Sequence, residues 1–362
     1  MSSLAEFLLV GGGTLVLFPL AWLLHRGVGL GSAELAVGFL TFHAATVIND
    51  PHFAVTYLLF YEDARSRALG RVFAPWQRAR YLIAGVLVPL ALLAWAIGAL
   101  ATGSARSLGW MIQLMFFLVR WHYVKQGFGV LAVLSARRGL AWSRAERRVI
   151  LAHCFAAWAI AWASPATPTR ELEEKGVVYW SLAHPPSLAH AAQLAFGLST
   201  LALIGVLGRK WRRERRLPVV PLTGFLVTVW LWTVFSSLDR VMVYLIPALH
   251  SVQYLYFVWL LKLPQAREAE GPPTFGRPAA LRLGILAASA IGLGWLLFRG
   301  GPALLDGLRA ARMMKPGAGD ATTDLGATPF FAAVYVFVNI HHYFMDNVLW
   351  RRENPETRYL RP

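Results

Sequence analysis

The sequence predicts an all-α integral membrane protein, a transmembrane helix bundle of about ten spans whose termini both face the cytoplasm. Of the 362 residues, 57% are hydrophobic and only 15% are charged, which is too apolar for a soluble domain of this size. The mean hydropathy of +0.49 agrees with this. We therefore expect residues 1–362 to form a single integral membrane domain, multi-pass and located in a bacterial inner (plasma) membrane.

The apolar residues gather in runs of about 20, the length that a helix needs to cross the hydrocarbon core. The first run begins MSSLAEFLLV, without a basic start or a small-residue cleavage pattern, and is expected to be a retained helix instead of a signal peptide. The connections 164–190 and 299–327 mix Pro, Gly and charge and are expected to be loops. The predicted spans are centred near residues 15, 47, 92, 121, 157, 199, 228, 252, 290 and 339.

The distribution of basic residues predicts the orientation, because Lys and Arg are retained on the cytoplasmic side. Of the 35 Lys and Arg residues, 24 lie in five segments on one predicted side: 61–81, 135–148, 208–218, 262–282 and 351–362. The formal net charge of +16 thus comes largely from belts such as GRKWRRERR beside the spans, where anionic head groups attract them. We expect membrane lipids as partners and no nucleic acid.

Four spans contain ionisable residues, which cost about 2.5–3.5 kcal/mol each at the bilayer centre and therefore tend to mark functional sites. The second span reads TFHAATVINDPHFAVTY. On one helix His43 and Asp50 would share a face, and Pro51 would kink the helix beside His52. Asn49 adds an amide to this group.

The fourth span reads LVRWHYVKQGFGV. His122, Lys125 and Gln126 are spaced i, i+3 and i+4 and lie on one helix face, with Arg120 and Tyr123 nearby. Arg120 and Lys125 would repel a metal cation, so we expect them to neutralise the carboxylates of neighbouring spans or to hold an anionic substrate head group. The eighth span repeats the pattern of a histidine with polar partners one turn away: His250, Gln253 and Tyr254.

The tenth span reads FVNIHHYFMDNVLWRR and is the most informative segment. Asn339, His342 and Asp346 line one stripe, with His341 about 100° round the helix. All four polar spans are even-numbered and would run parallel, so their imidazoles could surround one cavity. Four other histidines lie at ends, in loops or apart from polar groups and are left out of the site: His25, His153, His184 and His190.

Neutral imidazoles suit iron, copper or zinc, and a carboxylate adds a hard ligand. Cys154 is the only cysteine, so thiolate clusters are excluded. We expect one or two metal ions, with iron preferred. The predicted ligands are His43, His52, His122, His250, His341, His342 and Asp346.

Other polar residues of these spans are predicted to support the reaction. The predicted catalytic groups are Asp50, Lys125 and Asp346. The residues predicted to contact the substrate or to orient the ligands are Asn49, Arg120, Tyr123, Gln126, Gln253, Tyr254 and Asn339. Four tyrosines near the histidines could line a long apolar substrate: Tyr57, Tyr123, Tyr254 and Tyr343.

In general plan, the chain resembles the histidine-rich membrane oxygenases with non-haem iron. These are the fatty-acid hydroxylase and desaturase group and the Brp/Blh-type carotene dioxygenases. The resemblance rests on His52, His122, His250 and the His341–His342 pair within an apolar multi-span chain. The resemblance implies oxygen activation at iron, acting on an acyl chain or an isoprenoid, with an electron-donor protein as a further partner. The HxxxH and HxxHH signatures of desaturases are absent.

The leading hypothesis is therefore a metal-dependent membrane oxidoreductase, an oxygenase, hydroxylase or desaturase that acts on a lipid-soluble substrate. Three alternatives use the same residues. A membrane transferase with a lipid-linked donor would use a histidine as general base. A proton-coupled transporter would protonate His, Asp and Lys residues in turn. A haem protein would use two histidines as axial ligands.

Overall fold

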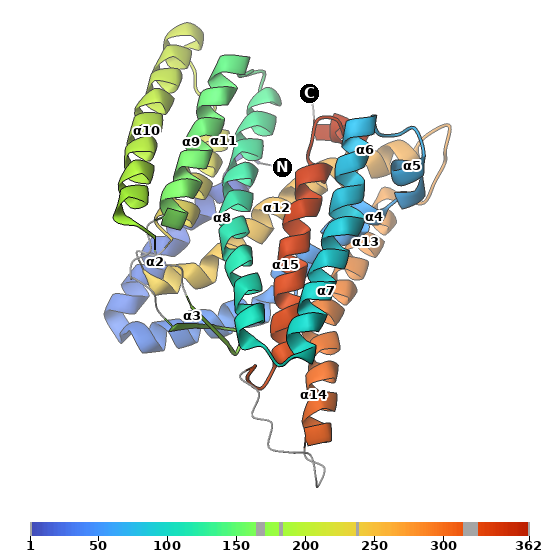
Figure 1. The fold of residues 1–362 in the computed structure, drawn as a ribbon. Helices are drawn as coiled ribbons and strands as arrows, with labels where there is room; N and C mark the ends of the chain where they lie inside the picture. The colour runs from blue at the N-terminus through green and yellow to red at the C-terminus, as the bar shows by residue number, and fades with distance from the viewer. Residues whose placement is uncertain (1, 164–170, 181–183, 237–238, 314–324, 361–362) are drawn as a thin grey trace.

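The computed structural model describes the whole chain except residues 1, 164–170, 181–183, 237–238, 314–324 and 361–362 (Figure 1). The described part is helical apart from one antiparallel hairpin, as expected for an all-α membrane protein. In chain order its elements are α1 (Ser3–Phe7), η1 (Leu8–Gly12), α2 (Gly13–Val28), α3 (Leu30–Ala45), α4 (Asn49–Tyr61), α5 (Ala64–Leu69), α6 (Pro75–Leu82), η2 (Ile83–Leu87), α7 (Val88–Ala101), α8 (Ala105–Ala136), α9 (Arg144–Ala163), β1 (Glu171–Glu174), β2 (Val177–Trp180), α10 (Pro186–Glu214), α11 (Val219–Leu226), η3 (Val227–Val234), α12 (Arg240–Glu270), α13 (Ala279–Trp295), η4 (Leu296–Gly300), α14 (Gly301–Met313), α15 (Pro329–Leu349) and η5 (Pro355–Leu360).

Among the described residues, six helical segments are long and apolar enough to cross a membrane, which indicates an integral multi-pass protein. Several of these segments expose apolar side chains that lipid would cover; Leu35, Leu87 and Leu201 are between 62% and 74% exposed. The helices α8 and α15 are not among the six, and their sequences carry polar residues of the predicted site. The six segments are Ser3–Val28, Leu30–Tyr61, Pro75–Ala101, Pro186–Glu214, Arg240–Glu270 and Ala279–Ala311. The full set of ten spans and their orientation in the membrane stay predictions.

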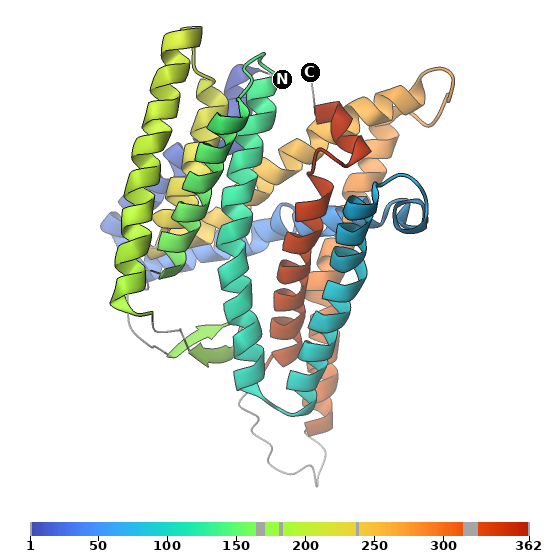
Figure 2. The same cartoon turned by 45° about the horizontal axis from the view of Figure 1, so that its top comes forward.

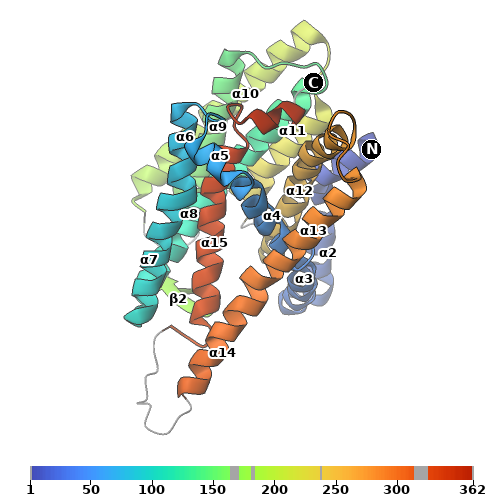
Figure 3. The same ribbon diagram turned by 90° about the vertical axis from the view of Figure 1, so that its right-hand side faces the viewer.

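The helices that carry the predicted site meet at the centre of the bundle. The upright helices α8 and α15 pack against each other, and α12 crosses obliquely beside them (Figures 1 and 2). Helix α4 packs against α12, α13 and α15, and the run α13–η4–α14 forms a long outer helix along it (Figure 3). Both termini lie toward the upper end of the view in Figures 1 and 2.

The second predicted span is broken, which corrects one expectation. Helix α3 ends at Ala45 and α4 begins at Asn49, so His43 and Asp50 do not share the face of one helix. The sequence Asn-Asp-Pro explains the break, because Asn and Asp favour helix starts and Pro is tolerated in a first turn, where its missing N–H is not needed. Pro51 therefore starts a helix instead of kinking one.

The predicted loop 299–327 is also partly wrong, because η4 and α14 occupy residues up to Met313. Asp306 of α14 accepts hydrogen bonds from the backbone N–H groups of Phe330 and Phe331, both at 2.9 Å, and so caps the first turn of α15. Within 164–190, the described residues form the β1–β2 hairpin and the start of α10. Residues 164–170, 181–183 and 314–324 of the two predicted loops lie outside the described residues.

Helix α4 approaches α13 most closely at a glycine. A Cβ atom on Gly294 would lie 2.7 Å from the carbonyl carbon of Asp50 and 2.8 Å from its oxygen. Such a contact with backbone cannot be relieved by rotating a side chain. This glycine therefore sets the position of the first turn of α4, two residues before His52.

We predict that Gly294→Ala lowers the unfolding free energy by about 1–3 kcal/mol, because the added methyl group pushes α4 and α13 apart. Gly292→Ala is the matched control on the same helix, since a Cβ there meets nothing within 4 Å. Thermal unfolding in detergent measures both. Equal melting temperatures for the two variants would contradict the close approach.

Candidate metal centre

Four of the predicted histidines converge in the core: His52 of α4, His122 of α8, His250 of α12 and His342 of α15. Each offers one ring nitrogen, and these four atoms all lie within 4.8 Å of one another. None of the four residues is more than 4% exposed. The cluster could therefore hold a metal ion that is shielded from solvent.

The shortest contacts in the cluster join Nε2 atoms. Nε2 of His52 lies 3.1 Å from Nε2 of His342, and Nε2 of His122 lies 3.2 Å from Nε2 of His250. Two nitrogens that bind one ion at about 2.0–2.1 Å, at angles between square and tetrahedral, lie about 2.9–3.4 Å apart. These two spacings fit a shared ion.

The four rings close into a cycle with edge-to-face contacts. His52 contacts His250 and His342, with ring centroids 4.9 and 4.5 Å apart, and His122 contacts the same two rings at 4.9 and 5.0 Å. Tyrosine rings surround the cycle: Tyr123 contacts His250, Tyr254 contacts His52, and Tyr343 contacts His122. An aromatic shell thus encloses the nitrogens.

Hydrogen bonds fix the tautomer of His52. Its Nδ1 lies 3.1 Å from the hydroxyl of Ser251 and 3.3 Å from the carbonyl oxygen of Asn49. The single Ser251 proton has two other acceptors, Asn49 Oδ1 at 2.9 Å and the Pro247 carbonyl at 2.7 Å. The proton between His52 and Ser251 therefore belongs to Nδ1, which leaves the lone pair of Nε2 facing the other imidazoles.

Hydrogen bonds do not fix the tautomers of the other three histidines in the cluster. Nδ1 of His250 and of His342 has no hydrogen-bond partner among the described residues. Nδ1 of His122 lies 3.7 Å from Oδ2 of Asp346. A cation bound at the Nε2 atoms would therefore fix these tautomers where hydrogen bonds do not.

Asp346 lies at the edge of the cluster, where one carboxylate oxygen accepts hydrogen bonds and the other lies near the ring of His342. Oδ1 accepts hydrogen bonds from the Tyr254 hydroxyl at 2.8 Å and from the Trp350 indole N–H at 3.2 Å. Oδ2 lies 3.4 Å from Nε2 of His342. This arrangement suits a carboxylate that either adds a ligand or compensates the charge of an ion.

Two predicted ligands lie outside the cluster. His43 is exposed near the end of α3, against Phe39 and Phe42. His341 is buried, but both of its nitrogens have oxygen partners at 3.0 Å, the Tyr57 hydroxyl at Nδ1 and the Ala84 carbonyl at Nε2. A neutral ring that accepts from Tyr57 and donates to Ala84 satisfies both contacts.

The predicted charged groups find other partners than expected. Asp50 is buried and lies 3.4 Å from Nε of Arg299, so neither Arg120 nor Lys125 neutralises it. Arg120 donates to the carbonyl oxygen of Ala161. Lys125 makes no ion pair among the described residues. The predicted catalytic roles of Asp50, Lys125 and Asp346 stay predictions.

Gln126 and Gln253 tie helices together, whereas Asn339 bonds within α15. Gln126 donates to Gln253 Oε1 at 2.6 Å, which links α8 to α12, and Gln253 donates to the carbonyl oxygen of Val10. Asn339 donates to the Tyr335 carbonyl one turn earlier at 2.8 Å and accepts from Tyr343 at 3.0 Å.

Sequence reasoning missed Ser251, Thr56, Trp350 and Arg299 as supporting residues. Thr56 lies 2.7 Å from the Tyr254 hydroxyl and so continues the chain that ends at Asp346. Ser251 is an ordinary residue in an apolar helix, and only the packing of α4 against α12 reveals its contact with His52. The spacing of Asp346 and Trp350 by one helical turn was the only local signal.

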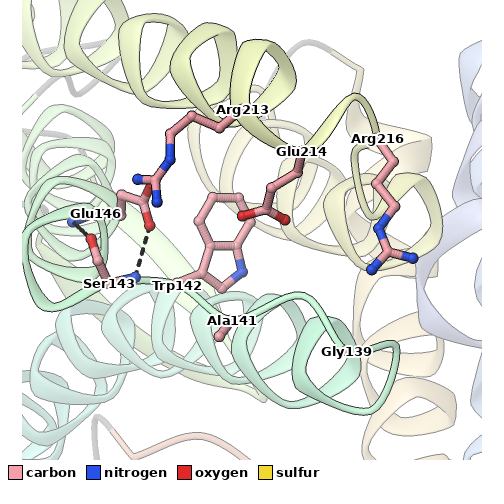
Figure 4. A pocket seen from close by; sticks show the side chains of 8 residues that line it. All are labelled: Gly139, Ala141, Trp142, Ser143, Glu146, Arg213, Glu214 and Arg216. Atoms are coloured by element: carbon pink, nitrogen blue, oxygen red, sulfur yellow. Dashed lines mark hydrogen bonds between the residues drawn. The ribbon is translucent and has the colours of Figure 1, made fainter.

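A separate cavity of about 590 Å³ lies between the α8–α9 connection and the C-terminal end of α10 (Figure 4). Trp142, Arg213 and Glu214 line it, and Glu214 is held by Lys210 at 2.7 Å. No histidine lines it, so it is not part of the four-histidine cluster.

The fold and the cluster define a helical membrane protein with a buried four-histidine site that could hold a metal ion. Comparisons with protein-family models, with curated proteins and with solved structures find no match to the chain.

We predict that Ser251→Ala weakens metal binding by about 10-fold, because an orienting partner of His52 is lost while the Asn49 carbonyl remains. Ser135→Ala is the matched control, since this serine is also fully buried but its hydroxyl has no partner among the described residues. Competition with a chelator of known affinity measures both. Equal affinities would show that Ser251 does not orient a ligand.

Proposed function

We propose that the chain is a membrane-embedded, metal-dependent oxidoreductase that binds iron at His52, His122, His250 and His342 and acts on a lipid-soluble substrate. The convergence of four imidazoles from four helices in a buried cluster carries this proposal. Burial of so many polar groups among apolar helices needs compensation, and a cation shared by four lone pairs supplies it.

The ligand chemistry supports a redox metal over a structural one. Four imidazoles with a nearby carboxylate and no thiolate suit iron or copper, whereas structural zinc sites usually contain cysteine. The carboxylate of Asp346 favours iron, the harder of the two ions. Bound iron would supply redox chemistry that no protein side chain provides.

The short nitrogen pairs favour a bare ion over haem. Axial ligands about 2 Å from iron on opposite faces of a porphyrin would place their nitrogens about 4 Å apart. The two shortest pairs, at 3.1 and 3.2 Å, are closer than that, and the four nitrogens together lie within 4.8 Å of one another. Tyrosine rings also pack directly against His52, His122 and His250, with centroids 4.7–4.8 Å apart.

The surrounding residues have definable tasks in such a reaction. Ser251 and Asn49 orient His52, and Tyr254 and Trp350 hold Asp346 with one oxygen facing the cluster. The enclosed apolar shell excludes water, which protects reactive species from solvent. A substrate that reaches this depth must partition into the bilayer, so an acyl chain or isoprenoid is expected, with electrons delivered by a donor protein.

We predict that the protein purified in detergent at neutral pH retains iron in stoichiometric amounts by elemental analysis, and that His342→Gln removes most of it because one of four ligands is lost. His43→Gln, an exposed histidine outside the cluster, should retain the metal. Size-exclusion profiles confirm that both variants are folded.

Copper, manganese or zinc in place of iron would contradict the choice of metal but not the site. The absence of any stoichiometric metal would contradict the site itself and favour a proton-relay or transferase activity that survives chelation.

A further inference from the structure

A cavity of about 630 Å³ lies between α4, α12 and α13, away from the separate cavity near α10. These three helices belong to three different candidate membrane spans, so the cavity lies between spans, and none of the four clustered histidines lines it. Its volume is in the range of sites for small organic ligands.

The two ends of the cavity differ in chemistry. Glu62, Lys262, Gln265 and Arg282 line one end, at the cytoplasmic ends that the basic segments predict for these helices. Apolar side chains line the rest, among them Leu58, Leu283, Leu286 and Leu293, and Tyr57 lies along the same wall. A polar end with an apolar extension matches an amphipathic molecule.

The charges at the polar end are not balanced. Lys262 is buried and lies 2.6 Å from Glu62, so this pair is neutral. Arg282 is exposed and makes no ion pair among the described residues. Gln265 also presents a buried Oε1 that has no hydrogen-bond partner in the described part of the chain. The polar end therefore offers one cation and one unused acceptor.

We propose that this cavity binds a single-chain lipid with an anionic head group, the head at Arg282 and Gln265 and the acyl chain along Leu286 and Leu293. A carboxylate or phosphate would pair with the guanidinium. A hydroxyl near the head, as in a lysophospholipid, would donate to Gln265 Oε1, whereas the carboxylate of a free fatty acid would accept from the Gln265 amide N–H. The shared chemistry is an acyl chain with an acidic head, whether a free fatty acid or a lysophospholipid.

The position of Tyr57 relates this lipid site to the four-histidine cluster. The Tyr57 hydroxyl bonds to Nδ1 of His341 at 3.0 Å, and His341 precedes the cluster residue His342 in the chain. Tyr57 lies five positions after His52 on α4, about 7.5 Å along a helix. This inference rests on the proposed function: it assigns acyl lipids as the substrate class and the cavity as their binding site.

Photolabelling of the purified protein in an uncharged detergent tests the site. The probe is a fatty acid with a diazirine near its methyl end, and mass spectrometry locates the labelled residues. We expect labels on α4 and α13 near Tyr57 and Leu293. Palmitate or palmitoyl-lysophosphatidate should compete with the probe more strongly than hexadecanol, and the stronger of the two acids identifies the head group.

Three variants sharpen the test. Leu286→Trp fills the cavity and should reduce labelling near Tyr57 and Leu293 at least fivefold. Gln265→Leu removes the polar amide from the head-group end and should also reduce labelling, by a smaller factor. Arg282→Gln should reduce the advantage of the acids over hexadecanol roughly threefold, a modest factor because the arginine is exposed. Arg213→Gln, an arginine that lines the separate cavity, is the matched control and should label as the unmodified chain does.

Labels spread over the lipid-facing helices and unchanged in Leu286→Trp would overturn the inference, as would equal competition by hexadecanol. Metal content measured on the same samples separates the two proposals. Protein that holds metal but does not label at this site contradicts the lipid site alone. Protein that labels as expected but holds no metal contradicts the proposed function alone.

Discussion

Four imidazole rings approach one another inside an apolar bundle, and their nitrogens come within 3.1–3.2 Å in two pairs. Lone pairs at that distance repel unless a proton or a cation lies between them, and bulk solvent screens this repulsion little because the four histidines are buried. A ring proton can bridge each pair as an Nε2–H···Nε2 hydrogen bond, but only a metal ion can be shared by all four nitrogens. The remaining features of the core are best understood as supports for that arrangement: Ser251 fixes the His52 tautomer, and Tyr254 and Trp350 hold Asp346 at the edge.

The fold brings these rings together from segments that are far apart in the chain. Asn49–Pro51 start a new helix, so that His52 enters the core from the first turn of α4. Gly294 lets α13 contact the backbone of that turn. At the other end of the bundle, Asp306 caps α15, the helix that carries His342 and Asp346. The helix start, the close approach at Gly294 and the Asp306 cap each involve only a few residues, and each helps to position a residue of the cluster.

Much of this architecture could be predicted from the sequence, because apolar runs and polar residues inside them are strong signals in a membrane protein. The helical class and the multi-pass character follow from composition, and four of the six histidines predicted as ligands meet in the structure. His341 could not be separated from His342 by sequence, since only the packing of α4 and η2 supplies the Tyr57 and Ala84 oxygens that satisfy it. The partner of Asp50 was equally hidden, because Arg299 lies 249 residues away and was placed in a predicted loop.

The central claim is that one ion is shared by these imidazoles, and X-ray absorption spectroscopy of the purified protein at the edge of its bound metal tests it most directly. We expect a first shell of several nitrogen ligands at about 2.0–2.1 Å, with the multiple-scattering pattern of imidazole rings. A shell of sulfur, a shell of oxygen without imidazole scattering, or no bound metal would contradict the shared ion and the function that we derive from it.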